Sequence, residues 1–306
     1  MNLLLQRGGR PFLRQPLFHA RYCKVDIIPH RTDIYYAVFR LTREVRFAVN
    51  TNPGSFDRSN PRAERPTNSY GGYPSLTGVG HYYRLQVTMA GELDPLSNYL
   101  VNIKLIDGFA REAIVPLVQE HIYAGTFFGG AGIVQDIFRR LGDCPPNLRC
   151  DEVRLWLSPF LSVGVLASEY PMVRFSQKFE FSASHRLHNP DLDEQQNRRT
   201  FGKCNNPLGH GHNYIVQVTI AGEPDYSGVL MEIPAFERIV AETVIEPFDH
   251  RNLNEEVEPF KTLIPTVENI AKVIYHLLKP KFAERNAKLA SVTVWETEKT
   301  WCEYVE

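Results

Sequence analysis

Residues 211–225 read GHNYIVQVTIAGEPD, and residues 80–94 read GHYYRLQVTMAGELD. Ten of these fifteen positions are identical, and the displacement, from His81 to His212, is 131 residues. Polar and apolar side chains alternate in both stretches, as they do in half-buried β-strands. The same displacement carries Ile-Val-Pro onto Ile-Glu-Pro further along the chain. We therefore expect one domain in tandem duplication, with a first half at 1–172 and a second half at 173–306.

The second half predicts strands, then two helices, then a closing strand. Alternating or short apolar runs predict strands at 173–187, 214–221, 229–231 and 289–297. Apolar residues at helical spacing follow Pro234, and a second helical stripe follows Thr266, a candidate N-cap. We expect an antiparallel α+β unit with two helices on one face of its sheet, in each half of the chain.

Composition narrows the class of protein. The chain has 306 residues, of which 43% are hydrophobic and 23% charged, as in a folded globular protein. A net charge of −1 argues against a nucleic-acid or membrane-surface partner, and no apolar run approaches the ~20 residues of a spanning helix. The polar start does not resemble a secretory signal. Five cysteines without a CxxC pair favour a reducing cytoplasm.

Three histidines of the second half are candidate metal ligands. His210 and His212 flank Gly211, and side chains at i and i+2 of a strand leave from the same face. His185 lies in another predicted strand and offers a third imidazole. Three neutral imidazoles with an open fourth position give the geometry of a catalytic zinc site. A surface pair or a hydrogen-bonded polar cluster is the alternative interpretation of His-X-His on a strand.

Five segments of the second half carry a resemblance to a known family. They are FSASHRL at 181–187, FGKCNNPLGHGHNY at 201–214, DHRNLN at 249–254, TVEN at 266–269 and WET at 295–297. In this order they closely resemble the family of 6-pyruvoyl-tetrahydropterin synthase and 6-carboxy-tetrahydropterin synthase, over about 173–306. The resemblance implies a tunnelling fold (T-fold), in which such units join through their sheet edges into barrels.

The resemblance implies catalytic roles for three residues. Cys204 matches the family's base, which removes a proton from the substrate side chain, and Lys203 and a zinc ion nearby would both favour its thiolate. Asp249 and His250 match a carboxylate–imidazole pair that passes protons. Adjacent side chains do not usually face each other, so this pair requires a turn.

Substrate-binding roles are implied for three more residues. Glu296 matches the carboxylate that holds the pterin ring through two parallel N–H bonds. Thr266 and Glu268 match a second pterin-contacting segment, although helix capping explains both equally well. Val267 replaces a threonine that is frequent in the family, and Glu232 replaces an Asp or Asn. Both departures bear on substrate detail.

The first half has lost these groups. Aligning the halves puts other residues at the positions of His210, Cys204, Asp249, His250 and Glu296, namely Val79, Tyr73, Val118, Gln119 and Leu157. His81 remains, and residues 43–50 offer no counterpart to His185. We predict a catalytically silent first half that serves assembly. The glycine-rich segment 125–132 lacks the lysine of a phosphate loop and predicts an ordinary loop.

The leading functional hypothesis is a zinc-dependent carbon–oxygen lyase of tetrahydrobiopterin biosynthesis. It would convert 7,8-dihydroneopterin triphosphate to 6-pyruvoyl-tetrahydropterin with loss of triphosphate. The alternative on the same scaffold is 6-carboxy-tetrahydropterin synthase of queuosine biosynthesis, which expels acetaldehyde. The six-residue step from Cys204 to His210 favours the pyruvoyl type. A non-catalytic pterin-binding or scaffold protein is the third hypothesis.

The expected partners are a small pterin substrate and further copies of the chain. In the family the sites lie between subunits, so the resemblance implies a homo-oligomer with sites at domain or subunit interfaces. If two domains replace two subunits, a trimer of chains would result; a dimer or a hexamer of chains remains open.

Overall fold

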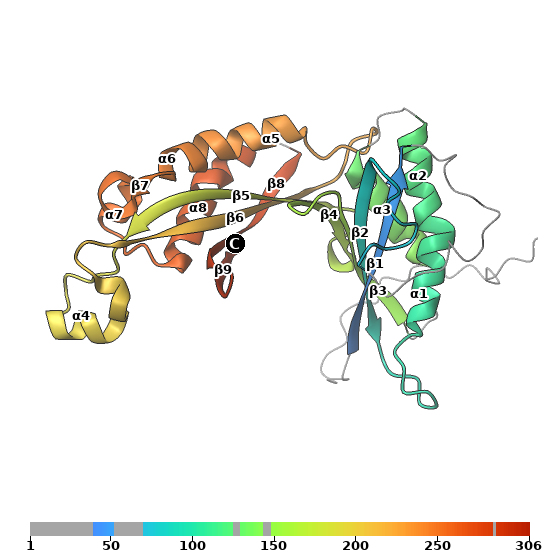
Figure 1. The fold of residues 1–306 in the computed structure, drawn as a ribbon, viewed down its shortest axis with the longest axis horizontal. Helices are drawn as coiled ribbons and strands as arrows, with labels where there is room; N and C mark the ends of the chain where they lie inside the picture. Colours follow the sequence, from blue (N-terminus) through green and yellow to red (C-terminus); the bar gives the residue numbers. More distant parts are fainter. Residues whose placement is uncertain (1–38, 52–69, 125–128, 143–147, 284–285) are drawn as a thin grey trace, which may run out of the picture. The chain divides into compact units, whose positions relative to one another are not determined.

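One antiparallel sheet runs through the part of the chain that the structure describes. The computed structural model describes residues 39–51, 70–124, 129–142, 148–283 and 286–306. The strands follow the order β1-β2-β3-β4-β5-β6-β8-β9. They are β1 (Phe39–Asn50), β2 (Gly80–Gly91), β3 (Leu148–Trp156), β4 (Leu161–Leu166), β5 (Val173–His185), β6 (His210–Gly222), β8 (Ala287–Thr297) and β9 (Thr300–Tyr304) (Figure 1). A short strand, β7 (Arg251–Asn252), pairs in parallel with β5.

Helices connect these strands and bury apolar stripes. The first half contains α1 (Ile103–Phe109), α2 (Val115–Tyr123) and α3 (Gly130–Leu141). The second half contains α4 (Glu194–Phe201), α5 (Ile233–Val240), α6 (Glu246–Phe248), α7 (Leu253–Glu256) and α8 (Val267–Phe282). The expected antiparallel α+β architecture is therefore observed. No helix of the described residues is long and apolar enough to cross a membrane.

The two halves share irregularities that strand periodicity alone does not require. Between β2 and β3 the register shifts at Thr88 and Met89, and between β6 and β8 it shifts at Thr219 and Ile220. These pairs occupy matching positions of the two similar stretches. Each half also contains a five-residue π-helical turn, Ala110–Ile114 in one and Ala241–Ile245 in the other.

Strand pairing also relates β1 to β5. Phe47 pairs with and stacks on Tyr83 in the first half, as Phe181 does on Tyr214 in the second, with ring centroids 5.5 and 5.0 Å apart. Counting along the strands from these aromatic pairs puts Thr51 at the position of His185. The first half therefore has a hydroxyl where the second has its buried imidazole.

Two predicted segments differ from the structure. Residues 229–231 are not a strand, because the Val229 carbonyl accepts the Asp225 N–H within a turn. The segment also has no strand neighbour in the part of the chain that the structure describes. The glycine-rich segment was expected to be a loop, but Gly130 begins α3. Glycine suits this helix start because a Cβ on the preceding Gly129 would lie 2.0 Å from the Gly228 carbonyl oxygen. Residues 125–128 lie outside the described residues.

The core of the second half is organised around the buried ring of Phe236 on α5. Phe175 meets this ring edge-on at 5.0 Å, and Phe282 of α8 packs at 5.9 Å. Phe236 on α5 therefore packs against both β5, the first strand of this half, and α8. Helices α5 and α8 thus support the sheet that carries the histidines.

Replacing Phe236 with alanine should lower the free energy of unfolding by about 3–5 kcal/mol, because a buried aromatic side chain is lost and a cavity remains. Urea denaturation measures this change. Tyr226→Ala is the matched control, since Tyr226 is fully exposed, and should change stability by less than ~0.5 kcal/mol. Equal effects of the two substitutions would contradict this account of the core.

Candidate metal and active site

Strand register brings the three histidines together. His185 ends β5 and pairs with His210, which begins β6, while His212 pairs with Ala183. Their ligand nitrogens all lie within 4.8 Å of one another. A search of the described residues for three or more His, Cys, Asp or Glu side chains that could hold a metal ion finds these three histidines. The structure thus places all three predicted ligands in one cluster.

The hydrogen bonding of these rings suits a metal ion. His185 is fully buried, and its Nδ1 lies 2.8 Å from the Pro265 carbonyl oxygen, to which it donates. Because Nδ1 carries the proton, Nε2 of His185 has a free lone pair, and it lies 3.1 Å from Nε2 of His210. A histidine that donates one ring N–H to a carbonyl and offers the other nitrogen to a metal ion is typical of metal sites. His210 Nδ1 and His212 Nε2 are buried without a hydrogen-bond partner. A cation would satisfy lone pairs that the protein leaves unpaired.

Burial also keeps two of the imidazoles, those of His185 and His210, neutral. It lowers the pKa of His185 to about 4, and burial together with His212 lowers the pKa of His210. Neutral imidazole is the form that coordinates metal, so both rings are ready to bind near pH 7. The residues present therefore fit a metal ion.

Glu296 borders the same cluster from β8. Its Oε1 lies 3.4 Å from His185 Nε2 and 3.6 Å from His212 Nε2, and its side chain is 20% exposed. The carboxylate predicted to bind substrate is thus next to the candidate metal ligands. A molecule held by Glu296 would lie beside the metal position.

Cys204 lies in a 3₁₀ turn, Gly202–Asn205. The Cys204 carbonyl accepts a hydrogen bond from the Leu187 N–H at 2.9 Å, which holds this turn next to the end of β5. Burial raises the pKa of the Cys204 thiol, and the negative charge of Glu296 raises it further. Lys203, which was expected to favour the thiolate, is not among the groups that shift this pKa. The thiol of the metal-free chain is therefore protonated at neutral pH, and a nearby cation would oppose both effects.

Asp249 and His250 form the predicted pair, although they are adjacent. His250 has φ of 57°, a left-handed conformation that turns its ring back, so that Nδ1 lies 2.8 Å from Asp249 Oδ2. Asp249 Oδ1 accepts the Ser182 N–H at 2.8 Å, which ties the pair to β5. This bond, followed by the one from His250, lowers the pKa of Asp249, so the carboxylate is ionised.

His250 opens onto a hollow of about 620 Å³ that His212 also lines. Its side chain is 82% exposed. Among the described residues, no hydrogen bond or ion pair joins Cys204 to His250. His250 thus shares a hollow with His212 of the histidine cluster but has no direct polar contact with Cys204, the candidate base.

Thr266 and Glu268 lie at the start of α8. Thr266 is the N-cap, and its hydroxyl accepts the Asn269 N–H at 3.3 Å, while Glu268 is exposed in the first turn. The capping role of Thr266 is therefore observed, Glu268 lies in the first helical turn as expected, and the substrate roles of both remain predictions. Pro265, just before the cap, holds His185 in place and was not identified from the sequence. No local sequence signal points to this contact, because every residue has a backbone carbonyl that can accept a hydrogen bond.

Comparisons with known proteins find relatives of the second half of the chain. A family model described as 6-pyruvoyl tetrahydropterin synthase matches residues 174–306. The 6-pyruvoyl tetrahydrobiopterin synthase of Homo sapiens is 40% identical over 124 residues, which are 40% of this chain and 84% of the relative. The 6-carboxy-5,6,7,8-tetrahydropterin synthase of Haemophilus influenzae is 29% identical over 156 residues, 44% of this chain and 100% of the relative. A structure of Caenorhabditis elegans 6-pyruvoyl tetrahydropterin synthase is 39% identical, covering 44% of this chain and 96% of that chain at a TM-score of 0.42.

These similarities define the class as enzymes of pterin synthesis. The chain belongs to the 6-pyruvoyl tetrahydropterin synthase family, and its second half spans most of the length of such relatives.

The buried His185 predicts a pH dependence of stability. Its pKa is about 4 in the folded chain and ~6.5 in the unfolded chain. At pH values between these two, His185 is protonated in the unfolded chain and neutral in the folded chain, so acid favours unfolding. Metal-free protein should therefore lose up to roughly 3 kcal/mol of stability from pH 6.5 to pH 4. Urea titrations of the wild type and of His185→Gln, which cannot take up this proton, measure the difference. An equal loss in the variant would contradict the assignment.

Proposed function

We propose that this protein is a zinc-dependent lyase that converts 7,8-dihydroneopterin triphosphate to 6-pyruvoyl-tetrahydropterin with loss of triphosphate. The proposal rests on the convergence of three imidazoles with Glu296, in the half of the chain that matches the named synthases. Zinc bound by His185, His210 and His212 would act as a Lewis acid toward the hydroxyls of the substrate side chain.

Glu296 and Cys204 hold and deprotonate the substrate in this proposal. Glu296 accepts the 2-amino and ring N–H groups of the pterin, a bidentate contact that orients the ring and directs its side chain toward the imidazoles. Cys204, as thiolate, removes a proton from that side chain, and triphosphate leaves. The ring gains two hydrogens, one from the first side-chain carbon and one from its hydroxyl, as that carbon becomes a carbonyl, so no external oxidant is needed.

His250 returns protons to the substrate from the side opposite Cys204 in this proposal. The ionised Asp249 carboxylate fixes its ring through Nδ1, which leaves Nε2 free toward the hollow shared with His212. An imidazole held in this way can accept a proton at one nitrogen and pass it on. Substrate must therefore reach both sides of the histidine cluster.

The alternative product is 6-carboxy-tetrahydropterin, supported by the similarity to the Haemophilus influenzae enzyme. It uses the same residues and releases acetaldehyde. The step from Cys204 to His210 favours the pyruvoyl product. A non-catalytic pterin-binding protein is the remaining alternative, and the loss of site residues from the first half is what supports it.

We also propose that the halves, 1–172 and 173–306, are tandem T-fold domains that arose by duplication, and that the first is catalytically silent. The matching register shifts and π-helical turns support this origin. Thr51, Val79 and Leu157 in place of His185, His210 and Glu296 support the loss of chemistry. A homo-oligomer in a reducing cytoplasm is the expected state.

Removing the thiol tests the lyase proposal. Cys204→Ala should lower kcat by 10²–10⁴-fold, the usual contribution of a general base, with metal content unchanged. Cys302→Ala is the matched control, because Cys302 is also a free, half-buried thiol of the second half. Chromatography of the products from 7,8-dihydroneopterin triphosphate measures turnover. Undiminished activity in Cys204→Ala would exclude this mechanism.

Product analysis also separates the alternatives. We expect 6-pyruvoyl-tetrahydropterin and triphosphate without acetaldehyde, since the side chain keeps all its carbons. Acetaldehyde in stoichiometric amount would identify the carboxy type. Binding of a pterin with no product of either kind would support the non-catalytic alternative.

A further inference from the structure

All three tryptophans of the chain border one hollow of the sheet. The hollow, called here the tryptophan hollow, has a volume of about 360 Å³ and is lined by residues of β3, β5, β6, β8 and β9. Trp156 comes from β3, Trp295 from β8 and Trp301 from β9. Indole rings offer flat apolar surfaces on which another planar ring can stack. The gathering of these rings therefore points to a planar partner.

The tryptophan hollow and the histidine cluster lie on opposite faces of the sheet. On β6, Gln217 of the hollow and His212 of the cluster are an odd number of positions apart. The same holds on β5 for Lys178 of the hollow and His185 of the cluster. Successive side chains of a strand point to opposite faces. The sheet therefore separates a molecule in the hollow from the candidate metal site.

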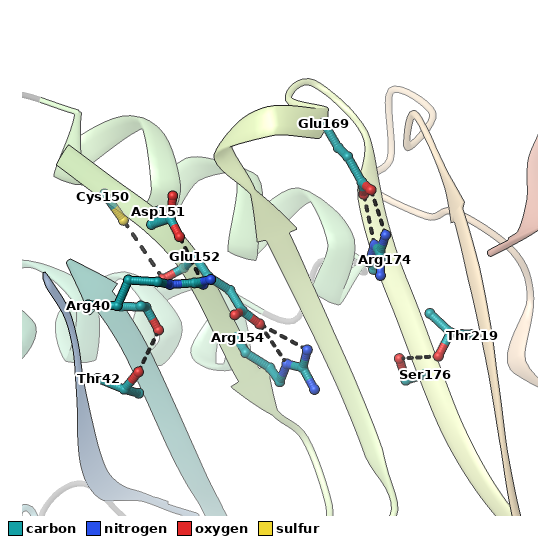
Figure 2. A network of polar contacts seen from close by, with 11 residues as sticks. Arg40, Thr42, Cys150, Asp151, Glu152, Arg154, Glu169, Arg174, Ser176 and Thr219 are labelled. Atoms are coloured by element: carbon teal, nitrogen blue, oxygen red, sulfur yellow. Dashed lines mark hydrogen bonds and ion pairs between the residues drawn. The ribbon is translucent and has the colours of Figure 1, made fainter. Parts of the chain in front are cut away.

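Small hydroxyl side chains form the floor of the tryptophan hollow. Ser176, Thr219 and Ser291 pair directly across β5, β6 and β8, and all three are buried. The Ser176 and Thr219 hydroxyls lie 2.9 Å apart (Figure 2). In the next row of the sheet, Thr293 pairs with Gln217. Hydroxyl and amide groups both donate and accept hydrogen bonds, so this floor suits a polar molecule.

Two arginines with fixed side chains line one end of the tryptophan hollow. Arg154 donates from Nε and Nη2 to Glu152, and Arg174 donates from the same two nitrogens to Glu169 (Figure 2). Both glutamates lie outside the lining of the hollow. Among the described residues, Nη1 of either arginine has no hydrogen-bond partner. The ion pairs therefore hold the guanidinium groups in place and leave their Nη1 donors for an anion.

Lys178 adds a cation that has no carboxylate partner in the described part of the chain. Its Nζ lies 4.6 Å from the centre of the Trp295 ring. Glu303 is the carboxylate of the lining, and it lies on β9, three strand spacings from Lys178 in the same row of the sheet. At the usual spacing of strands this separation is roughly 14 Å. The hollow is therefore polarised, with cations at β3 and β5 and a carboxylate at β9.

We propose that the tryptophan hollow binds a nucleoside monophosphate whose base carries an amino group. The phosphate accepts N–H bonds from Arg174 and Lys178, which are the strongest kind of hydrogen bond to such a group. The base stacks on Trp301, whose side chain is 57% exposed and thus open to a partner. The amino group of the base donates to Glu303. This binding site does not depend on the proposed function.

Each feature of the tryptophan hollow selects one part of this ligand. A phosphate ion alone would use the cations and leave the indole rings without a partner. An uncharged aromatic molecule would use the rings and leave the charge of Lys178 without a counter-charge. A molecule with a phosphate at one end and an amino-bearing ring at the other matches the polarity from β5 to β9.

Binding of adenosine 5′-monophosphate (AMP) to the full chain tests the proposal. Because every tryptophan borders the hollow, AMP should change the intrinsic tryptophan fluorescence. Isothermal titration calorimetry should give a dissociation constant below ~1 mM. Ribose 5-phosphate, which lacks the base, and adenosine, which lacks the phosphate, should each bind at least ~10-fold more weakly. No binding of AMP, or equal binding of either fragment, would overturn the proposal.

Substitutions locate the bound AMP. Lys178→Gln and Trp301→Ala should each weaken binding by ~10-fold or more, because one removes a charge-assisted contact and the other a stacking surface. Lys178→Arg keeps the charge and should retain most of the affinity. Lys272→Gln, at an exposed position of α8, is the matched control and should bind AMP as the wild type does. Circular dichroism checks that each variant is folded, and wild-type affinity in folded Lys178→Gln and Trp301→Ala would refute the site.

A substitution at the candidate active site separates the two faces of the sheet. Glu296→Gln should bind AMP with wild-type affinity, because Glu296 borders the histidine cluster and does not line the hollow. Loss of AMP binding in this variant would place the nucleotide in the candidate active site and would contradict the proposal. Each of these measurements reports binding alone, so a protein without turnover would refute the proposed function and leave this test intact.

Discussion

The pairing of β5 with β6 is the constraint on which the candidate site depends. His185 stands opposite His210, and His212 lies one pleat further along, so three imidazoles share one face. A slip of one residue would move the ligands of one strand to the other face of the sheet. The bond from His185 to the Pro265 carbonyl then selects the nitrogen that faces the cluster. Burial keeps that nitrogen unprotonated.

The same frame without these groups is present in the first half. Its strands keep the register shift and the stacked aromatic pair, yet Thr51 and Val79 replace two imidazoles and Leu157 replaces Glu296. Buried, unpaired imidazole nitrogens are costly unless an ion or a ligand satisfies them. If the first half serves only assembly, as proposed, the replacement of these groups would stabilise it. The contrast therefore separates what the fold requires from what the chemistry requires.

Local pattern predicted much of the fold and of the cluster. Alternation in the similar stretches predicted strands, and the His-X-His spacing predicted two ligands on one face. The pairing of Asp249 with His250 depends on a left-handed φ that no neighbouring glycine indicates. The Pro265 carbonyl lies 80 residues from His185, beyond the reach of local pattern. The raised pKa of Cys204 depends on burial and on Glu296, both of which arise only from folding.

Metal content per chain tests the central claim most directly. Elemental analysis of the purified wild type should find one zinc ion per chain, because one of the two halves has the three imidazoles. His212→Ala should lose that ion, whereas His81→Ala, the matched change in the first half, should retain it. A wild type without bound metal, or the same metal content in both variants, would contradict the account.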